Sequence, residues 1–554
     1  MLLLSKKGGR RRMLQSLAYF YCWLIRFIIP VAAVTVIYLL FKILIGSKKE
    51  KPIFSRLVDQ NGKIFPITSK ENIIGRGRHC DIVIRSKSAP LNAAAITLGE
   101  NGWTLHPVGD ILLNGNEPEA AEQIAHGDII TVASAELTLD DSRDPYIPYD
   151  KNDELNLVRA KCATVILTML QVMVALSLII HYLSTDAFPI QLPICFSGLV
   201  AAEWLYLSIK KFDCVGIELC AFFLCTFGLA VAASAMPNSL YKQFIAMMLG
   251  LLLFIVISFV LKNLSLTMKL RYAVGIIGVG ILFFNILFGT ELNGAKNWID
   301  LGFITVQPSE FVKIAYIFAG CASLERLITT RNFLLFTGFS GACLLPLFIM
   351  RDFGTASIFF IGMLIIVFMR SGDLKAIILF IVAAIIGAAA IIALKPYVAS
   401  RFATYLHAWE NPYSGGYQQV NTMIAIGSGG LFGVGGGEGN LDTIAAADTD
   451  LVFGFIVEEW GLIIGLCCVA ILILFTLYAI KRAGMTRSVY YSIAAAAASG
   501  MFLFQAALNI FGSTDLLPLT GVTLPLISNG GSSIMASMGM LAFIKSAGLG
   551  GDTR

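Results

Sequence analysis

The residue types best suited to chemistry gather in one long polar stretch, from Arg401 to Glu459, of an otherwise very apolar chain. The stretch carries the carboxylates of Glu410 and Asp450 and eight glycines between Gly427 and Gly439. A carboxylate can act as a general base toward a hydroxyl group. Irregular backbone at a membrane is tolerated only where it is buried in protein or lines a wet cavity. We therefore expect the functional site here.

A second group lies in the run LNGAKNWIDLGFITVQPSEFVKIAYIFA. Pro308 and Ser309 suit the first turn of a helix. Glu310 and Lys313 are three residues apart, so they share one helix face. Ionisable groups at the edge of a membrane helix are costly unless they are paired or face a cavity. Two interpretations of Glu310 and Lys313 stay open, a functional site or a structural ion pair. Trp298, in the same run, suits either the membrane interface or a substrate groove.

Composition places both groups in a polytopic membrane protein. The chain has 554 residues, of which 57% are hydrophobic and 14% charged, and its mean hydropathy is +0.77. The net charge of +5 is small, and no basic stretch interleaved with aromatics indicates nucleic-acid binding. The eleven cysteines are scattered without a CxxC motif. We interpret them as small buried residues rather than metal ligands or disulfides.

Apolar segments of the length needed to cross a membrane, about 20 residues, follow one another along most of the chain. Residues 1–45 form an N-terminal transmembrane segment, and twelve spans are predicted near 157–183, 188–208, 213–235, 239–261, 272–289, 306–324, 332–350, 353–370, 374–394, 452–480, 488–511 and 521–545. Glu203 and Glu218, inside spans, are expected to pair with Lys210 or Lys211.

Lysine and arginine set the orientation of these spans. One set of alternate loops carries seventeen of them and the other only five. By the positive-inside rule, residues 46–150 and the C-terminal segment are cytoplasmic, and the large loop 395–451 faces outward.

Residues 46–150 alternate short apolar strands with Asn-Gly and Gly-Asp turns, which predicts a small β-sandwich. IIGRGRHCDIVIRS and HGDIITVASAELTL resemble the two ends of a forkhead-associated (FHA) domain. The resemblance implies phosphothreonine-peptide binding through Arg76. Pro90 and Ala93, however, stand near the family's Ser and His positions. Two interpretations remain, a phosphopeptide-binding domain or a folding and docking module for a cytoplasmic protein partner.

Four motifs of the membrane part occur in order: GAKNWIDLG with QPSEFVK, then GYQ with AIGSGGLFGVG, then TDLVF with EEWG, and finally PLISNGGSS. Together they resemble the SEDS (shape, elongation, division and sporulation) family over about residues 212–545. The implied fold is an α-helical polytopic membrane protein with ten core helices in 212–554. About three helices are then additions, namely the N-terminal segment and two helices in 151–211.

The resemblance implies that the protein polymerises lipid II into peptidoglycan strands at the outer face of the bacterial cell membrane, in division or cell-shape maintenance. A class B penicillin-binding transpeptidase is the implied partner. An acceptor hydroxyl attacks the donor sugar and lipid pyrophosphate leaves, which needs a general base and positive charge. Besides the base, the implied substrate-binding residues are Trp298, Glu310, Lys313, Arg401, Tyr417, Gln418, Glu458 and Glu459. No cofactor is assigned, although a divalent cation is compatible with this chemistry.

One departure from the family bears on activity. The family has an aspartate six residues before the tyrosine of GYQ, and this chain has Asn411 there. An amide cannot accept the proton, so Glu410 or Asp450 would have to serve as the base. The alternatives are a non-catalytic scaffold for a transpeptidase and a transporter of lipid-linked precursor.

Two features near this loop also have structural explanations. The glycine run lacks the Lys-Ser/Thr of a phosphate-binding loop, so close packing or a re-entrant turn is expected. Glu458 and Glu459 are expected at the outer start of a span, where the helix dipole favours negative charge.

Overall fold

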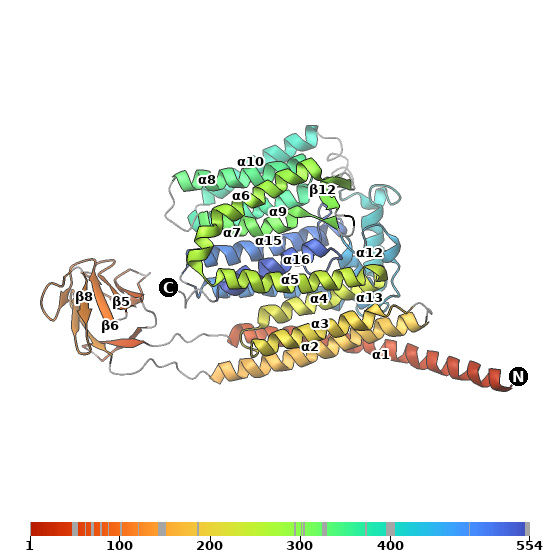
Figure 1. Ribbon diagram of the computed structural model, residues 1–554, viewed down its shortest axis with the longest axis horizontal. Helices are drawn as coiled ribbons and strands as arrows, with labels where there is room; N and C mark the ends of the chain where they lie inside the picture. The colour runs from red at the N-terminus through yellow and green to blue at the C-terminus, as the bar shows by residue number, and fades with distance from the viewer. Residues whose placement is uncertain are drawn as a thin grey trace. The chain divides into compact units, whose positions relative to one another are not determined.

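The computed structural model describes residues 2–46, 54–60, 62–67, 71–77, 80–86, 88–99, 102–119, 121–141, 151–184, 188–292, 295–300, 302, 305–323, 330–371, 374–394, 405–486 and 488–548. The chain divides into two compact units. One comprises Met1–Leu44 with Leu157–Arg554, and the other comprises Ile45–Asn156. Each unit is described by itself (Figure 1).

The smaller unit is a sandwich of two five-stranded sheets, with strand orders β2-β1-β10-β9-β7 and β4-β3-β5-β6-β8. Leu57 and Leu137 from one sheet and Ile96 and Leu105 from the other are buried in one hydrophobic cluster. The predicted β-sandwich is therefore confirmed. Its strands are β1 (Ser55–Asp59), β2 (Ile64–Ile67), β3 (Glu71–Gly75), β4 (Ile82–Val83), β5 (Ala94–Gly99), β6 (Gly102–Pro107), β7 (Leu112–Leu113), β8 (Glu122–Ile124), β9 (Ile129–Val132) and β10 (Ala135–Asp140).

The larger unit is a bundle of long apolar helices. They are α1 (Leu2–Gly46), α2 (Lys151–Ser184), α3 (Gln191–Ile209), α4 (Gly216–Ala235), α5 (Leu240–Leu261), α6 (Leu264–Phe288), α7 (Pro308–Ser323), α8 (Thr330–Ile349), α9 (Phe353–Ser371), α10 (Leu374–Leu394), α12 (Tyr417–Gly429), α13 (Val452–Trp460), α14 (Leu462–Ala483), α15 (Val489–Ser513) and α16 (Gly531–Ser546). Among the described residues, ten helices are long and apolar enough to cross a membrane. The prediction of a multi-pass membrane fold is confirmed.

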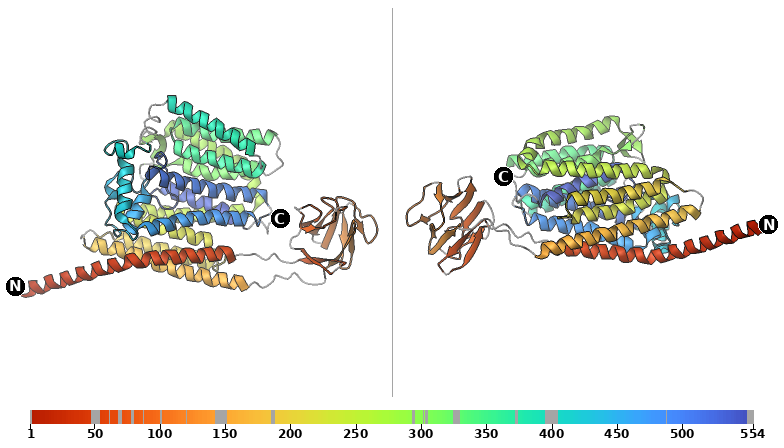
Figure 2. Two further views of the ribbon diagram at one scale, coloured as in Figure 1. Left: turned by 180° about the vertical axis from the view of Figure 1, so that it is seen from behind. Right: turned by 60° about the horizontal axis from the view of Figure 1, so that its bottom comes forward.

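Short elements cover one end of these helices. A three-stranded sheet comprises β11 (Thr290–Leu292), β12 (Ala295–Asp300) and β13 (Thr305–Val306), and the short helices are η1 (Pro237–Ser239), η2 (Ala408–Glu410) and η3 (Leu441–Thr443). Helix α12 lies across the end of the bundle in Figure 1 and in the left view of Figure 2. This end carries the loops in which the sequence predicts the site.

Two predicted spans differ from the structure. The span 452–480 is broken at Gly461, which separates α13 from α14. Gly461 has φ +90°, and a Cβ there would collide with the carbonyl oxygen of Leu431, so the passing glycine-rich loop breaks the helix. The span 521–545 is a 16-residue helix, α16, that begins only at Gly531. Residues 514–530 are instead a loop between α15 and α16.

Helices α1, α2 and α3 lie side by side along one edge of the bundle (Figure 2), and their buried residues belong to the same hydrophobic cluster as the rest. In the middle of α1, Arg26 lies against Gly435 of the glycine-rich segment. Near the end of this helix, the Leu40 carbonyl accepts a hydrogen bond from Tyr478.

The predicted lysine partners of the two glutamates are wrong. Glu203 accepts a hydrogen bond from the Gln171 amide at 2.7 Å. Glu218 forms an ion pair at 2.8 Å with Lys545, which approaches from α16. Both partners come from other helices because a buried carboxylate needs a group that packing brings against it.

Candidate functional site

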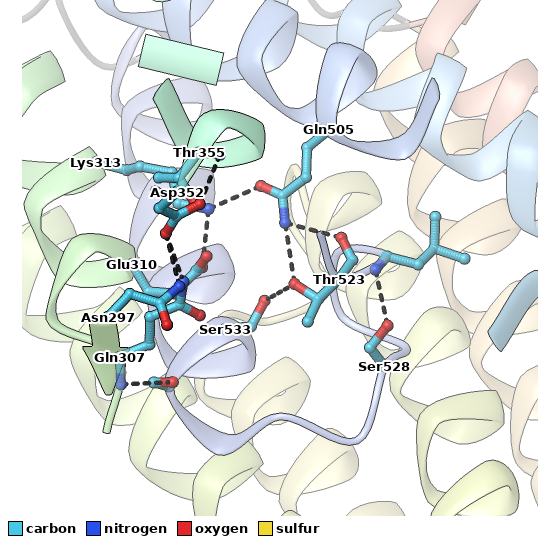
Figure 3. A network of polar contacts seen from close by, with 12 residues as sticks. Asn297, Gln307, Glu310, Lys313, Asp352, Thr355, Gln505, Thr523, Ser528 and Ser533 are labelled. Atoms are coloured by element: carbon cyan, nitrogen blue, oxygen red, sulfur yellow. Dashed lines mark hydrogen bonds and ion pairs between the residues drawn. The ribbon is translucent and has the colours of Figure 1, made fainter. Parts of the chain in front are cut away.

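A buried ion pair stands at the start of α7. Lys313 Nζ lies 2.8 Å from Glu310 Oε2, and the side chains are 1% and 5% exposed. The helix begins at Pro308, as predicted, and the three-residue spacing puts both groups on one face. Both side chains of the pair are therefore buried in the protein. Figure 3 shows the pair among the other polar side chains of this region.

A chain of hydrogen bonds leads from this pair to the loop before α16. Lys313 Nζ donates to Gln505 Oε1 at 2.8 Å. Gln505 Nε2 donates to the carbonyl of Thr523 at 2.9 Å, and the Thr523 hydroxyl lies 2.6 Å from that of Ser533. Figure 3 shows this chain from α7 through α15 to the loop. Gln505 is not among the residues predicted from the sequence, although a glutamine inside an apolar helix is itself a signal.

Asp352 is another buried carboxylate near this network, and it is not among the residues predicted from the sequence. It accepts hydrogen bonds from Asn297 Nδ2 at 2.9 Å, from Gln307 Nε2 at 3.2 Å and from the Thr355 amide at 3.1 Å. The last contact is an N-cap, because α9 begins at Phe353. Asp352 thus ties the small β-sheet to the start of α9 (Figure 3). Its signal in the sequence is an acid directly before an apolar helix.

Asp450 and its neighbour Asp448 meet the same loop. Asn529 Nδ2 donates to Asp448 Oδ2 at 2.8 Å. Asn509 Nδ2 donates to the carbonyls of Asp450 at 3.0 Å and of Val522 at 2.8 Å. Residues 514–530 therefore contact both the TD motif and the Glu310–Lys313 network.

Glu410 and Asn411 lie on the surface of the large loop. The Glu410 carboxylate is 3.0 Å from His407 Nδ1, and its side chain is 72% exposed. Asn411 is exposed, and its amide donates to the Ala408 carbonyl at 3.1 Å. His407 is thus a partner of Glu410. Arg401 lies outside the described residues.

The next two candidates of this loop lie in α12. Tyr417 is the first residue of the helix and is partly exposed. Gln418 donates to the carbonyl of Ala445 at 2.8 Å, which ties α12 to the segment leading to Asp450.

Glu458 and Glu459 end α13 rather than beginning a span, so the predicted dipole explanation is wrong. Their carboxylates instead accept backbone amides of the glycine-rich loop. Glu458 binds the amides of Asn440 and Leu441, each at 3.0 Å, and Glu459 binds that of Gly437 at 3.0 Å. Helix α13 is not among the ten helices that could cross a membrane. Burial raises the pKa of the Glu459 carboxyl group to about 8.

The glycine run is packed against neighbouring helices, as expected. A Cβ at Gly436 would lie 2.7 Å from Trp460, and one at Gly437 would lie 2.7 Å from the His181 ring. The carboxylate of the adjacent Glu438 lies 2.8 Å from His181 Nδ1, within hydrogen-bond distance. The close-packing interpretation therefore holds for this segment.

Trp298 and Arg76 complete the predicted set. Trp298 lies in β12, pairs with Thr290 and is partly buried. Arg76 is exposed in the smaller unit, and its amide donates to the Pro90 carbonyl at 2.8 Å.

The structure joins some of these residues and leaves others apart. Glu310 and Lys313 form one network with Gln505 and Thr523. Glu458 and Glu459 lie at the end of α13 and bind backbone amides of residues 437–441 instead. Among the described residues, no group of three or more His, Cys, Asp or Glu side chains could hold a metal ion.

Comparison with known proteins matches the larger unit. The family model for FtsW, RodA and SpoVE, described as "Cell cycle protein", matches residues 215–548. A relative from Tolumonas auensis named "Probable peptidoglycan glycosyltransferase FtsW" is 32% identical over 270 residues, covering 47% of this chain and 70% of that protein. "Stage V sporulation protein E" of Bacillus subtilis is 30% identical over 256 residues, covering 44% and 69%.

A solved structure points the same way. It is described as "Structural coordination of polymerization and crosslinking by a peptidoglycan synthase complex". The TM-score is 0.52 at 25% identity, covering 59% of this chain and 95% of that one. The family match covers nearly the same residues as the SEDS resemblance, which is thereby confirmed. The family and the apolar helices make the chain a multi-pass bacterial membrane protein. The chain belongs to the FtsW, RodA and SpoVE family of cell cycle proteins.

Proposed function

We propose that this protein is a peptidoglycan glycosyltransferase that polymerises lipid II at the outer face of the membrane, in cell division or cell-shape maintenance. The observation that carries the proposal is the match of the whole core, residues 215–548, to a family in which relatives are named peptidoglycan glycosyltransferases. The buried Glu310–Lys313 network and the exposed loop around Glu410 lie within that matched core.

Glu410 is the proposed general base. The reaction removes a proton from the acceptor sugar hydroxyl as that oxygen attacks the anomeric carbon of the donor. Asn411 cannot take this proton. Asp352 is occupied by three hydrogen bonds and is 7% exposed. The Glu410 carboxylate is exposed and lies 3.0 Å from Nδ1 of His407. This exposure supports Glu410 as the base, because a base must be reachable by the acceptor sugar.

The departing group is lipid pyrophosphate, and its negative charge must be balanced. Arg401 is the proposed cation for this step. Trp298, Tyr417 and Gln418 are proposed to contact the sugar and peptide parts of the substrate. Glu310 and Lys313 neutralise each other at 2.8 Å and hold α7 and α15 in register through Gln505.

A transpeptidase of the class B penicillin-binding type is the proposed partner, because crosslinking must follow polymerisation. The solved complex similar to this chain combines both activities by its description. For the smaller unit, a cytoplasmic protein partner is proposed; phosphopeptide recognition there rests on Arg76.

One observation favours a second candidate function. Asn411 occupies the position of the family aspartate, and Glu410, the nearest carboxylate in sequence, already has His407 as a partner. A non-catalytic scaffold would keep transpeptidase and substrate binding without forming polymer. A lipid-precursor transporter would likewise need no general base.

Polymerisation of lipid II by the purified protein with its transpeptidase tests the proposal. We expect glycan from the native chain and a loss of about 10²–10⁴-fold in Glu410→Gln. Glu438→Gln is the matched control, because Glu438 is another exposed outer glutamate paired with a histidine. It should leave the rate near that of the native chain.

Two results would reject this assignment of the base. If only Asn411→Asp makes glycan, the native chain is a scaffold. If Glu410→Gln and Glu438→Gln both polymerise at the native rate, Glu410 is not the base.

A further inference from the structure

Asp515 occupies an unusual position in the loop that follows α15. Its φ is +60°, a left-handed conformation that favours glycine and that aspartate tolerates better than most residues. The residue is 8% exposed. A buried carboxylate in a strained turn needs hydrogen-bond donors to offset its lost hydration.

Both carboxylate oxygens of Asp515 accept backbone amides of the large loop. Oδ1 accepts from Leu406 at 3.2 Å, and Oδ2 accepts from Ala408 at 3.3 Å. The hydroxyl of Tyr405 adds a parallel contact, donating to the Leu516 carbonyl at 3.2 Å. Two segments more than 100 residues apart in sequence are thus joined at one side chain.

Ala408 connects Asp515 to the turn that carries Glu410, the proposed base. It is buried, it is the first residue of η2, and its carbonyl accepts the Asn411 amide at 3.1 Å. Gly416 packs so closely on Ala408 that a Cβ there would collide with it. Ala408 is therefore fixed on both sides, and Glu410 stands on the turn between Ala408 and Asn411.

The loop that carries Asp515 also reaches the rest of the site. The Thr523 carbonyl accepts a hydrogen bond from Gln505 Nε2, and Gln505 Oε1 accepts one from Lys313 Nζ. Val522 shares the Asn509 side chain with Asp450. One loop, 514–530, therefore sets the position of the Glu410 turn relative to the buried network.

We propose that Asp515 is a positioning residue for glycan polymerisation, which holds the backbone of residues 406–411 so that Glu410 meets the acceptor hydroxyl. This rests on the proposed function of that loop. Asp515 is not itself the base, because both of its oxygens accept backbone amides and it is buried. Misplacing a reacting group by about 1 Å can cost on the order of 100-fold in rate.

Two variants separate this role from a general effect on folding. Asp515→Gly suits φ +60° and removes both acceptors, so the turn should survive while the large loop is released. Asp515→Asn keeps the shape and one acceptor but faces the second amide with an NH₂ group. Asp442→Asn is the control, because Asp442 is an exposed acid of the same outer region.

Hydrogen exchange and kinetics are measured on the full-length protein with its transpeptidase. In Asp515→Gly, the peptide covering 405–411 should exchange faster, kcat should fall about 10- to 100-fold, and the KM for lipid II should stay near the native value. Asp515→Asn should lie between Asp515→Gly and the native chain, with an unchanged pH profile. Asp442→Asn should match the native chain in both measurements.

Exchange at 405–411 that does not change in Asp515→Gly would overturn the anchoring role. Loss of the acidic limb of the pH profile in Asp515→Asn would also overturn it, since Asp515 would then be the base. Faster exchange in a protein whose native form makes no polymer would support the anchor and contradict the proposed function instead.

Discussion

Several buried charges in this protein have a partner that is distant in sequence. Lys313 is paired with Glu310 one helical turn away, but its second contact, Gln505, is 192 positions further along the chain. Glu458 and Glu459 likewise depend on amides of the glycine-rich loop. A buried ion that loses its partner costs far more than the intact pair contributes.

Replacing Lys313 by methionine should therefore destabilise the protein strongly. The buried Glu310 carboxylate would lose its cation, at a cost of about 3–5 kcal/mol. Thermal unfolding in detergent should show a clearly lower midpoint. The double variant Glu310→Gln with Lys313→Met should recover much of the loss, because no lone charge remains. A single variant that unfolds at the native temperature would show that the carboxylate finds another partner.

At the scale of elements, the glycine-rich segment is shaped by the helices around it. Its backbone amides donate to the carbonyls at the end of α13, from Val434 to Glu458 and from Gly435 to Glu459. Side chains of α1 and α2 occupy the space where Cβ atoms of Gly435 and Gly437 would stand. Added helices thus pack directly on a motif of the family core.

Gly437→Ala should destabilise this segment. The residue has φ +79° and a Cβ would lie 2.7 Å from His181, so conformational strain of about 1–3 kcal/mol adds to a steric clash. Gly427→Ala is the control. Gly427 is helical with open space at its Cβ, and alanine there should be neutral or stabilising by up to about 1 kcal/mol. Thermal unfolding of both variants checks the contrast.

The cause can then be isolated. Adding His181→Ala to Gly437→Ala removes the clash and leaves only the backbone strain, so part of the loss should return. If the double variant is no more stable than expected from adding the two single effects, the ring is not what constrains the glycine.

At the scale of the whole molecule, two separate hydrophobic cores divide the chain. The β-sandwich has its own buried cluster, and α1 contributes Ile29, Ala33, Val36 and Leu40 to the cluster of the helical unit. The two units should therefore respond differently to truncation.

Replacing residues 47–150 by a flexible linker should leave the unfolding temperature of the helical unit nearly unchanged. Removing residues 1–46 should lower it, because α1 covers apolar residues of the core cluster. Thermal unfolding of both truncated chains in detergent tests this contrast. Equal losses in the two would mean that the β-sandwich stabilises the helical unit.

The sequence by itself determined the family, the membrane class, the β-sandwich and the face shared by Glu310 and Lys313. Each depends on local information: hydropathy over about 20 residues, strand alternation, or three-residue spacing on a helix. Only the tertiary structure decided which groups Asp352, Gln505 and Asp515 bind. It also decided that Gly461 breaks the span 452–480 and that Glu458 and Glu459 bind loop amides. These features depend on contacts between groups that are distant in sequence, and the packing of the whole chain determines which of those contacts form.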